Sequence, residues 1–495
     1  MPAQLLTKSS FTSFIECAIK LWLEKVRPDI GLPEEPGLER IFEQGRMVDD
    51  LARGLYPGGI AIKDYNHAGF KNTQAAIASG AKVLYQPTAV ADGLSARADI
   101  LTLGKGGKWD LHEVKMATEV KEDYLYDVAF QKLCFEAAGI PIGKTFLAHI
   151  NNKYVRQGEV EVDKLFTEED ISAKVADVMT EVENLIPQAK AVFKWPRELA
   201  AQHLAGCPDL TKCAFAGRWF NHFDPSEKEA ALRELDAATV AEMLENGVVA
   251  LDGLSDDYLA SIPYRTPEER WPLAIDRHAI KKEIEALEYP LYFFDYETYY
   301  YPVPPFDGYV PYQQIPFQYS LYVLDAEGAE PRIHDFLMPT FEDPALALIE
   351  DLKSVVGPTG NFIAWNASFE MGRNKDLATI HPEHAEFMLG INTRMYDLMM
   401  PFKRKAYVHP GFRGSASLKK VMPTLIPELS YDKLGIHKGD EASASWPVIT
   451  DPATPEEQRK KLIADEIEYC RLDVYAMVRI LEELRKIAEP KNPFE

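Results

Sequence analysis

The sequence predicts an α/β protein in which two domains are joined by a helical connector. The chain has 495 residues, a length that favours two or three domains over one hydrophobic core. Residues 98–115 contain two alternating segments around a glycine-rich turn, and residues 289–298 form an apolar strand-like run. Near the C-terminus, apolar residues repeat at steps of four and three, which predicts a long helix with one apolar face.

Composition and charge exclude several classes of protein. The 46% of hydrophobic residues and 26% of charged residues are typical of a globular chain. We expect a cytoplasmic protein without membrane contact, because no apolar run is long enough to span a bilayer or to form a signal peptide. Five cysteines in so long a chain do not predict a disulfide framework. The net charge of −23 argues against loose adhesion to nucleic acid but allows a local basic track.

Two helices are predicted before the first strands. Residues 7–25 carry a capping residue, Thr7, and an apolar face, and Cys17 lies within this segment. A second helix is expected around residues 38–55, because a proline and two glycines then act as a stop signal.

The predicted hairpin brings an acidic pair next to a lysine. Pairing of Leu103 with Lys108 across the turn would place Asp99 within one residue of Glu113, and Glu113 shares a strand face with Lys115. Two carboxylates can hold Mg²⁺, and a lysine beside them can orient a water molecule or offset the charge of a phosphate. This combination predicts a site that hydrolyses phosphodiesters. The alternative is an exposed hairpin with a cross-strand Glu/Lys pair.

The order of these elements carries a family resemblance. Its residues are Cys17 on the first helix, Gly45 on the second, then Asp99, Glu113-Val-Lys115 and Gln131 on a following helix. This order is similar to the RecB-like nucleases of the PD-(D/E)xK fold, which include CRISPR-associated exonucleases. The resemblance implies a restriction-endonuclease-like domain over residues 1–222. It also implies that Asp99 and Glu113 bind a metal ion, that Lys115 is catalytic and that Gln131 starts a Gln-x-x-x-Tyr element that contacts nucleic acid, although residue 135 is Phe.

The same resemblance implies an iron–sulfur cluster bound by four cysteines. Cys17, Cys207 and Cys213 fit the first three ligand positions, whereas Trp219 stands at the fourth. Soft thiolates select zinc or iron–sulfur clusters. One alternative completes the set with His203 or His222. The other is a branch of the family that has lost its cluster and keeps three buried thiols.

A helical connector, residues 223–286, is expected to lead into a C-terminal domain of residues 287–495. At its start, Asp295 and Glu297 are two apart at the end of the apolar strand and therefore share a face. A divalent cation would relieve their repulsion, and Mg²⁺ or Mn²⁺ prefers such oxygen ligands. The alternative is a strand end that runs into a polar loop.

Two further acidic positions follow in this domain. A short strand at residues 361–364 enters a helix that we expect Asn366 to cap, and Glu370 lies one turn further on. In the C-terminal helix, which we expect a capping box at residues 454–457 to start, Tyr469 and Asp473 are four apart and point the same way. Asp397 is predicted to be structural.

This order of motifs resembles the DEDD exonucleases, in their tyrosine variant. The resemblance implies an RNase H-like domain with a mixed sheet. It also implies that two metal ions, Mg²⁺ or Mn²⁺, are held by four carboxylates and that Tyr469 positions the attacking water. The implied metal ligands are Asp295, Glu297, Glu370 and Asp473. Over nearly its full length the chain resembles an uncharacterised bacterial family that joins a RecB-like nuclease domain to an RNase H-like domain. The alternative is a degenerate scaffold whose acidic groups only solvate an edge.

Residues 401–420 contain six cations and no acidic residue. The cations are Lys403, Arg404, Lys405, Arg413, Lys419 and Lys420. Three aromatic residues alternate with them and are expected to stack on bases, and two glycines would let the backbone approach phosphate: Phe402, Tyr407, Phe412, Gly411 and Gly414. The segment predicts a track for a single strand. The alternative is a solvated loop whose cations pair with acidic neighbours.

The function predicted from these features is a metal-dependent nuclease that acts on a strand end. The C-terminal domain is expected to carry a 3′–5′ exonuclease activity. The alternative is a catalytically weakened nuclease fold that binds nucleic acid or a partner without cutting.

Overall fold

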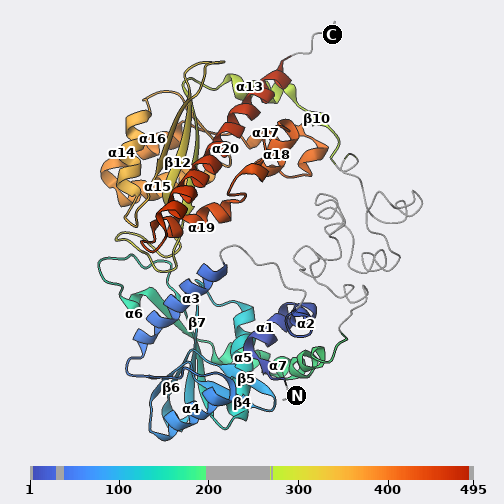
Figure 1. The fold of residues 1–495 in the computed structure, drawn as a ribbon, viewed down its shortest axis with the longest axis vertical. Helices are drawn as coiled ribbons and strands as arrows, with labels where there is room; N and C mark the ends of the chain where they lie inside the picture. The colour runs from blue at the N-terminus through green and yellow to red at the C-terminus, as the bar shows by residue number, and fades with distance from the viewer. Residues whose placement is uncertain (1–3, 29–37, 197–267, 269–270, 490–495) are drawn as a thin grey trace, which may run out of the picture. The chain divides into compact units, whose positions relative to one another are not determined.

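A computed structural model of the chain describes residues 4–28, 38–196, 268 and 271–489. The chain divides into two compact units, and each is described by itself (Figure 1). The N-terminal unit comprises Met1–Tyr154 and Gly158–Tyr264, and the C-terminal unit comprises Val155–Gln157 and Arg265–Glu495. Both units combine helices with mixed sheets, which confirms the predicted α/β class. Among the described residues, no helix combines the length and apolar character needed to cross a membrane.

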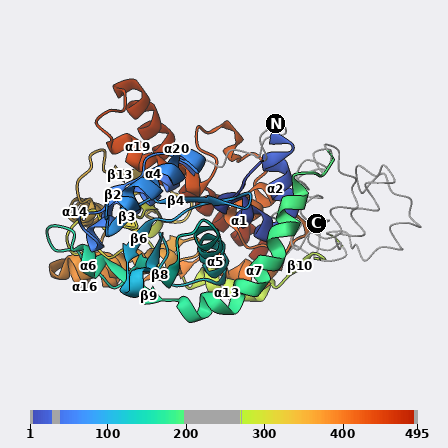
Figure 2. The same cartoon turned by 90° about the horizontal axis from the view of Figure 1, so that it is seen from below.

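The N-terminal unit is built on a six-stranded sheet with the order β2-β3-β6-β7-β8-β9 and a smaller sheet with the order β1-β5-β4. Its strands are β1 (Leu6–Thr7), β2 (Ile60–Ala61), β3 (Val83–Tyr85), β4 (Thr88–Ala91), β5 (Leu94–Arg97), β6 (Ile100–Leu103), β7 (Trp109–Lys115), β8 (Ile142–Ile150) and β9 (Phe166–Asp170). Its α-helices are α1 (Lys8–Glu16), α2 (Ala18–Lys25), α3 (Leu38–Ala52), α4 (Asn66–Ala78), α5 (Glu122–Ala137), α6 (Val162–Leu165) and α7 (Ser172–Val192). Helices α5 and α7 pack against β8 and against each other (Figure 2).

The first predicted helix is interrupted at Cys17. Thr7 caps α1 as expected, because its side chain accepts a hydrogen bond from the Ser10 amide at 3.2 Å. Cys17 has an extended backbone (φ −167°, ψ 125°) and separates α1 from α2, so the prediction that it lies within one continuous helix is wrong. The break lets apolar side chains of both helices enter the same core, among them Phe11 and Trp22. Cys207 and Cys213, the other predicted cluster ligands, lie outside the described residues, as does Trp219.

The predicted hairpin forms, but its register is one residue away from the expected one. Leu103 pairs with Trp109 rather than with Lys108. The reason is the turn, in which Gly104 donates its amide hydrogen to the Lys108 carbonyl at 2.8 Å around a short 3-10 turn at Lys105–Gly107. Continuation of this register places Asp99 directly opposite Glu113.

The C-terminal unit is built on a five-stranded mixed sheet with the order β13-β12-β11-β14-β15, and β10 and β16 form a separate pair. Its strands are β10 (Ala274–Ile275), β11 (Leu291–Tyr299), β12 (Ile315–Leu324), β13 (Arg332–Leu337), β14 (Asn361–Ala364), β15 (Met395–Asp397) and β16 (Tyr407–Val408). Its α-helices are α13 (Arg277–Glu285), α14 (Ala345–Val355), α15 (Ser368–Ile380), α16 (Ala385–Thr393), α17 (Met400–Lys403), α18 (Leu418–Leu425), α19 (Gly439–Thr450) and α20 (Glu456–Ala488).

The alternation of side chains along β11 separates two apolar layers. Leu291 and Phe293 point to one face of the sheet and pack in a core with α13, α18 and α20. Tyr292 and Phe294 point to the other face and pack with α14, α15 and α16 (Figure 1). Because side chains two apart share a face, Asp295 continues the row that faces α20. The long helix α20 follows the predicted apolar stripe, and its buried residues include Cys470, Val474 and Leu481.

Two predicted caps are not formed. Ala367, not Asn366, is the N-cap of α15, and Asn366 instead adopts a left-handed backbone with φ 65°. Helix α20 has Pro455 as its N-cap without a side-chain hydrogen bond, because the Thr454 hydroxyl donates to the Val448 carbonyl at 2.7 Å. Most of the predicted connector lies outside the described residues. Helix α13, its last part, packs through Ile280 and Ile284 into the C-terminal core.

Candidate functional site

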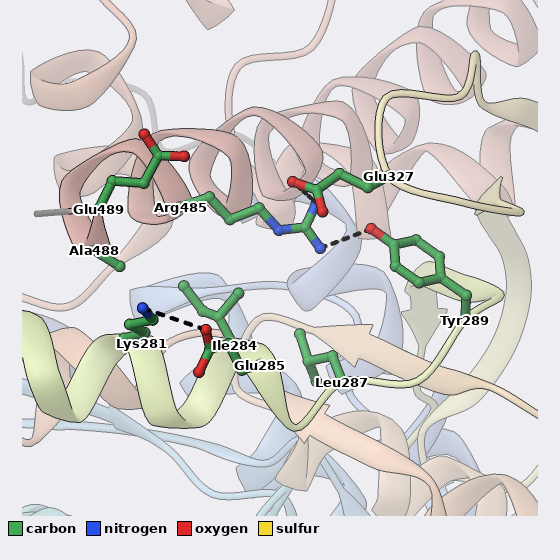
Figure 3. Close-up of a pocket in the computed structure, with 9 residues that line it drawn as sticks. All are labelled: Lys281, Ile284, Glu285, Leu287, Tyr289, Glu327, Arg485, Ala488 and Glu489. Carbon is green, nitrogen blue, oxygen red and sulfur yellow. Dashed lines mark hydrogen bonds and ion pairs between the residues drawn. The ribbon is translucent and has the colours of Figure 1, made fainter.

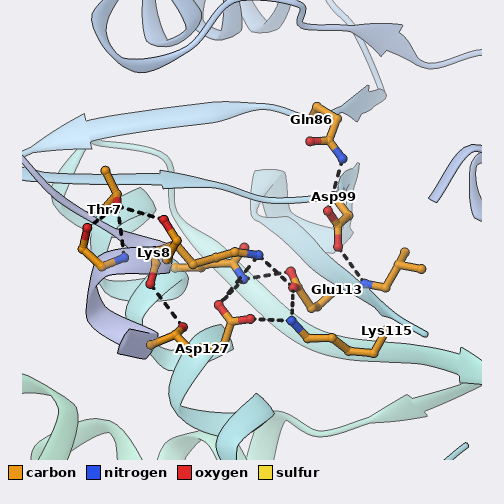
Figure 4. Close-up of polar contacts among 12 residues, drawn as sticks. Thr7, Lys8, Gln86, Asp99, Glu113, Lys115 and Asp127 are labelled. Carbon is orange, nitrogen blue, oxygen red and sulfur yellow. Dashed lines mark hydrogen bonds and ion pairs between the residues drawn. The ribbon is translucent and has the colours of Figure 1, made fainter. Parts of the chain in front are cut away.

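The N-terminal unit brings its predicted acidic pair and lysine together (Figure 4). Lys115 and Glu113 share the face of β7 that α5 covers, and Lys115 Nζ lies 2.8 Å from Glu113 Oε1. Lys115 Nζ also donates to Asp127 Oδ2 at 2.6 Å. Asp99 accepts hydrogen bonds from the Val114 amide at 2.8 Å and from Gln86 Nε2 at 3.2 Å. The cluster therefore contains all three residues predicted from the hairpin.

Two members of this cluster were not predicted. Lys8, in the first turn of α1, donates from Nζ to Glu113 Oε1 at 2.8 Å. Asp127, on α5, accepts a hydrogen bond from Lys115 and lies one helical turn before Gln131. The spacing of Asp127 to Gln131 was a usable signal, since residues four apart on a helix point the same way. No local signal links Lys8 to a residue so distant in the sequence.

Gln131 has a different role from the predicted contact with nucleic acid. It is fully buried, and its Nε2 donates to Glu113 Oε2 at 2.8 Å and to Asp127 Oδ1 at 3.2 Å. A buried amide that holds two carboxylates has no surface to offer a strand, so the predicted contact is wrong. Gln131 instead fixes the orientation of Glu113.

The charges of the N-terminal cluster neutralise one another. Burial opposes ionisation of Glu113, but Lys115 and Lys8 outweigh it and lower the pKa of this carboxyl. Burial and then the charge of Glu113 raise the pKa of Asp99 well above its usual value. Burial and then Glu113 raise the pKa of Asp49, on α3, to about 6. Every carboxylate oxygen of Asp99 and Glu113 accepts at least one hydrogen bond from the protein.

In the C-terminal unit, β11 and α20 bring a second acidic group together. Asp295 and Glu297 lie next to Cys470, and one ligand atom from each of the three residues lies within 4.8 Å of the other two. Cys470 Sγ is 3.7 Å from the Asp295 carbonyl oxygen and 3.9 Å from Asp295 Oδ2. The sequence prediction missed Cys470 as part of the site, although its place between Tyr469 and Asp473 was visible.

This acidic group has few hydrogen-bond donors. Glu297 is 7% exposed, and no described residue donates a hydrogen bond to its carboxylate. Asp295 Oδ2 is approached only by the weak thiol donor of Cys470 among the described residues. Burial and then Asp473 raise the pKa of Asp295, and burial and then Asp295 raise that of Glu297. Glu297 is buried, whereas Asp295 is partly exposed. Carboxylates this close without donors repel one another, and a divalent cation between them would remove that cost.

Asp473 completes this side of the site. Tyr431 donates its hydroxyl hydrogen to Asp473 Oδ1, and burial raises the pKa of Asp473 to about 6. Lys419 Nζ lies 5.2 Å from the ring centroid of Tyr431 and 5.5 Å from that of Tyr469. Lys419 also opposes the raised pKa values of Glu297 and Asp473, which places its charge near both carboxylates. Tyr431 and this position of Lys419 were not predicted.

Glu370 is the acid that α15 supplies. It lies in the first turn of α15, is 2% exposed, and its Oε2 has no hydrogen-bond partner among the described residues. Burial raises the pKa of Glu370 to about 8, and its charge contributes to the raised pKa of Asp295. Asp397 accepts hydrogen bonds from the amides of Asn366 and Met399, both at 3.0 Å. These bonds agree with the predicted structural role of Asp397.

The chain is similar to proteins of undescribed function. Residues 292–417 match a family described as a domain of unknown function, DUF2779. An uncharacterized protein of Mycoplasma pneumoniae, described as an MG366 homolog, is 28% identical over an alignment of 207 residues that covers 38% of this chain and 31% of that protein. The match therefore spans less than two thirds of the relative. The matched family range includes Asp295, Glu297 and Glu370 and ends before α20.

The donor set of the C-terminal site fits a divalent cation. Asp295, Glu297 and Asp473 supply oxygen atoms, which hard cations prefer. Within the described ranges, no strong donor contacts the carboxylates of Asp295 and Glu297, so a cation would not have to displace one. In the N-terminal cluster, by contrast, a cation would have to displace Lys8 or Lys115 from Glu113. The carboxylates of the C-terminal site are therefore available to a cation, whereas Glu113 of the N-terminal cluster is not available without the loss of an ion pair.

The predicted base-stacking surface of residues 401–420 does not exist. Phe402 and Tyr407 are 6% exposed, Phe412 is 3% exposed, and the three rings pack together with centroid distances of 5.2–5.9 Å. The glycines also serve internal packing. A Cβ atom on Gly411 would lie 2.7 Å from Thr424, and one on Gly414 would lie 2.7 Å from Trp271.

The six cations of this segment have separate environments. Lys403, Arg404 and Lys405 are exposed, although Arg404 Nη1 lies 3.1 Å from Glu283 Oε1. Lys419 lies at the carboxylate site, and Arg413 and Lys420 have other interactions within the chain. Only the first three remain together as the predicted track. An exposed ion pair such as Arg404–Glu283 is weak and breaks easily.

A pocket of about 400 Å³ lies between α13 and the end of α20 (Figure 3). Its charged side chains interact with one another. Arg485 Nη1 lies 3.9 Å from Glu327 Oε1, and Lys281 Nζ lies 3.6 Å from Glu285 Oε1. Arg485 Nη2 also donates to the Tyr289 hydroxyl at 2.8 Å. The pocket is formed at the start of β11, whereas the carboxylates lie near the other end of this strand. It therefore takes no part in the acidic site.

Proposed function

We propose that the chain is a metal-dependent nuclease that removes nucleotides from the 3′ end of a strand through its C-terminal unit. One observation carries this proposal. Asp295 and Glu297 are held together next to Asp473, and the described residues give the carboxylates of Asp295 and Glu297 no strong hydrogen-bond donor. Carboxylates held this close repel one another unless a cation or a proton lies between them. Mg²⁺ or Mn²⁺ is the expected occupant.

The architecture of the C-terminal unit supports the proposal. Its mixed five-stranded sheet has helices on both faces, as the resemblance to RNase H-like domains implies. The acidic residues come from β11, α15 and α20, in the order expected for DEDD exonucleases. Glu370 departs from the usual Asp of these exonucleases. We infer that it binds the second cation more weakly.

The residues of the site have separable roles in this proposal. Asp295, Glu297 and Asp473 hold the cation, which when bound supplies activation of water and stabilisation of the leaving oxygen. Tyr431 fixes Asp473 through its hydroxyl group. Tyr469 lies beside Asp473, where its hydroxyl can position the attacking water. The ammonium group of Lys419 lies near the same carboxylates and is available to a phosphate of the strand.

The N-terminal unit favours a second candidate role, which is binding without cutting. The observation is that both carboxylate oxygens of Glu113 already interact with the protein, through Lys8, Lys115 and Gln131. A lysine pair next to carboxylates can contact phosphate, while the loss of free carboxylate oxygens weakens metal binding. In this role the N-terminal unit grips the strand that the C-terminal unit shortens.

A double variant tests whether the N-terminal unit also cuts. Asp295→Asn removes the C-terminal activity, and we expect Lys115→Ala to remove any cleavage that then remains. The reason is that Lys115 contacts both Glu113 and Asp127. The measurement is nucleotide release from labelled DNA and RNA by the single and double variants. The exposed Lys144→Ala is a matched control that should leave residual cleavage unchanged.

Two results would decide the role of this unit. If Asp295→Asn alone leaves no cleavage, the N-terminal unit supports the C-terminal one. If cleavage persists in the double variant, Lys115 does not act in catalysis. Lys115 is not the only cation on this face, because Lys8 also contacts Glu113.

The exposed cations of residues 403–405 are predicted to bind the strand. We expect replacement of Lys403, Arg404 and Lys405 by Ala to weaken single-strand binding and to reduce its log–log salt slope by up to about 2 for three lost phosphate contacts. Binding is measured across a salt series in the Asp295→Asn background. A control variant replaces three exposed lysines elsewhere on this unit, Lys282, Lys460 and Lys461. An unchanged slope in the test variant, or an equal change in the control, would contradict the predicted track.

The proposed function is tested by metal-dependent degradation with purified protein. Wild type, Asp295→Asn and Lys115→Ala are compared with Mg²⁺, Mn²⁺ or a chelator on single-stranded DNA and RNA. The proposal requires cleavage that depends on the cation and on Asp295. Cleavage that depends on Lys115 but not on Asp295 would assign the activity to the N-terminal unit instead.

A further inference from the structure

We propose that Cys470 is a further ligand of the cation held by Asp295 and Glu297, and that its thiolate biases this position toward the borderline cation Zn²⁺ over Mg²⁺. The inference rests on the proposed function, because it concerns the same site, and it adds the class of metal. Carboxylates alone do not separate these cations strongly, whereas a thiolate does, since Mg²⁺ binds sulfur poorly.

The geometry of the three ligand atoms fits a shared cation. With a metal–sulfur distance of about 2.3 Å and a metal–oxygen distance of about 2.1 Å, two tetrahedral ligands are separated by roughly 3.6 Å. Cys470 Sγ lies 3.9 Å from Asp295 Oδ2. Glu297 also places a ligand atom within 4.8 Å of both. Small side-chain rotations are sufficient to close the site around one ion.

Glu297 supplies an independent indication of a ligand. The residue is 7% exposed, its carboxylate lies within reach of the same point as Cys470 Sγ, and it receives no hydrogen bond from any described residue. Buried carboxylates normally accept several hydrogen bonds. Lys419 acts on Glu297 electrostatically but makes no hydrogen bond or ion pair with it in the described part of the chain. A cation is the partner that this carboxylate lacks.

Cys470 differs from an ordinary core cysteine of the same chain. Cys134 is equally buried in the N-terminal unit, and its Sγ donates to the Ala89 carbonyl at 3.5 Å within an apolar core. Cys470 lies instead against the main-chain and side-chain oxygens of Asp295. Its position on α20, three residues before Asp473, directs it to β11. Cys134 is therefore a suitable control.

The test is a titration of the full-length chain with Co²⁺, Zn²⁺ and Mg²⁺. Cys17, Cys207 and Cys213 are first replaced by Ser, so that the predicted cluster thiols do not compete. We expect Co²⁺ to produce a thiolate-to-metal absorption band in this background. Cys470→Ser should abolish the band and weaken Zn²⁺ binding by about tenfold or more, with little effect on Mg²⁺ binding. Cys134→Ser should change neither result.

A second variant keeps the test decisive if Cys470→Ser does not fold. Asp295→Asn retains the thiol but removes its neighbouring ligand, so the absorption band should also be lost in this variant. A band that survives Asp295→Asn, or an absent band while Zn²⁺ still binds, would overturn the assignment of Cys470.

The outcomes separate this inference from the proposed function. A thiolate band without nucleotide release would support the Cys470 ligand and contradict the nuclease. Nucleotide release with Mn²⁺ but without a thiolate band would do the reverse.

Discussion

Asp295→Asn is expected to reduce nucleotide release by at least about a thousandfold, because it removes a charged metal ligand from the centre of the acidic group. The amide has nearly the same shape as the carboxylate, so the fold should be retained. The substitution also removes the charge of residue 295, which repels Asp473 and Glu297. The variant should therefore be no less stable than wild type in the absence of metal. The measurement is the initial rate of release with Mn²⁺ at saturating substrate.

A carboxylate on the same sheet gives the matched control for this change. Asp325 lies in the turn between β12 and β13, is exposed, and pairs with Arg332 at 2.9 Å. Asp325→Asn should leave the rate within about twofold, since exposed ion pairs contribute little. Release that survives both Asp295→Asn and Asp473→Asn would contradict the assignment of catalysis to the C-terminal unit.

Glu466→Gln is expected to stabilise the protein increasingly as the pH rises. Glu466 is fully buried on α20, and Ser445 donates to its Oε1 at 2.5 Å, while its Oε2 lacks a partner among the described residues. Burial raises the pKa of Glu466 to about 8. In the unfolded chain its pKa is about 4.3. Between these values the native state holds a proton that the unfolded state has lost, so stability falls as the pH rises.

The expected size of this effect follows from the linkage relation. The difference in unfolding free energy between Glu466→Gln and wild type should grow by up to about 1.4 kcal/mol per pH unit from pH 5 to pH 8. It is measured by urea unfolding with a chelator present, followed by tryptophan fluorescence. Glu468→Gln, on the exposed side of the same helix, should not show this growth. A difference that is constant over the pH range would mean that Glu466 is ionised in the native state.

The sequence patterns that predicted correctly were local and periodic. Alternation along β11 predicted that the side chains of Asp295 and Glu297 lie close together on one face of the strand. The four-three spacing along α20 predicted that Cys470 belongs to the apolar stripe. These patterns act within one element, where geometry is set by residue number alone. The same reasoning placed Glu113 and Lys115 together on β7.

The errors arose where one element meets another. The hairpin register depended on a turn of unexpected length, and Lys8 reached Glu113 from the far N-terminal end of the chain. The aromatic residues of the basic segment had two possible partners, a nucleic acid base or one another. Hydrophobic burial favours packing of the rings on one another, and Phe412 lies in the core with Phe402. Such choices depend on packing between distant segments, which composition and spacing do not encode.

The most direct test of the central claim uses single strands labelled at either the 3′ or the 5′ end, as DNA and as RNA, with wild-type protein and Mn²⁺. The C-terminal site predicts early release of labelled mononucleotides from the 3′-labelled strand and stepwise shortening of the 5′-labelled strand. A chelator should stop both. Intact strands under all metal conditions, or release that begins at the 5′ end, would contradict the claim that this unit is a 3′–5′ exonuclease.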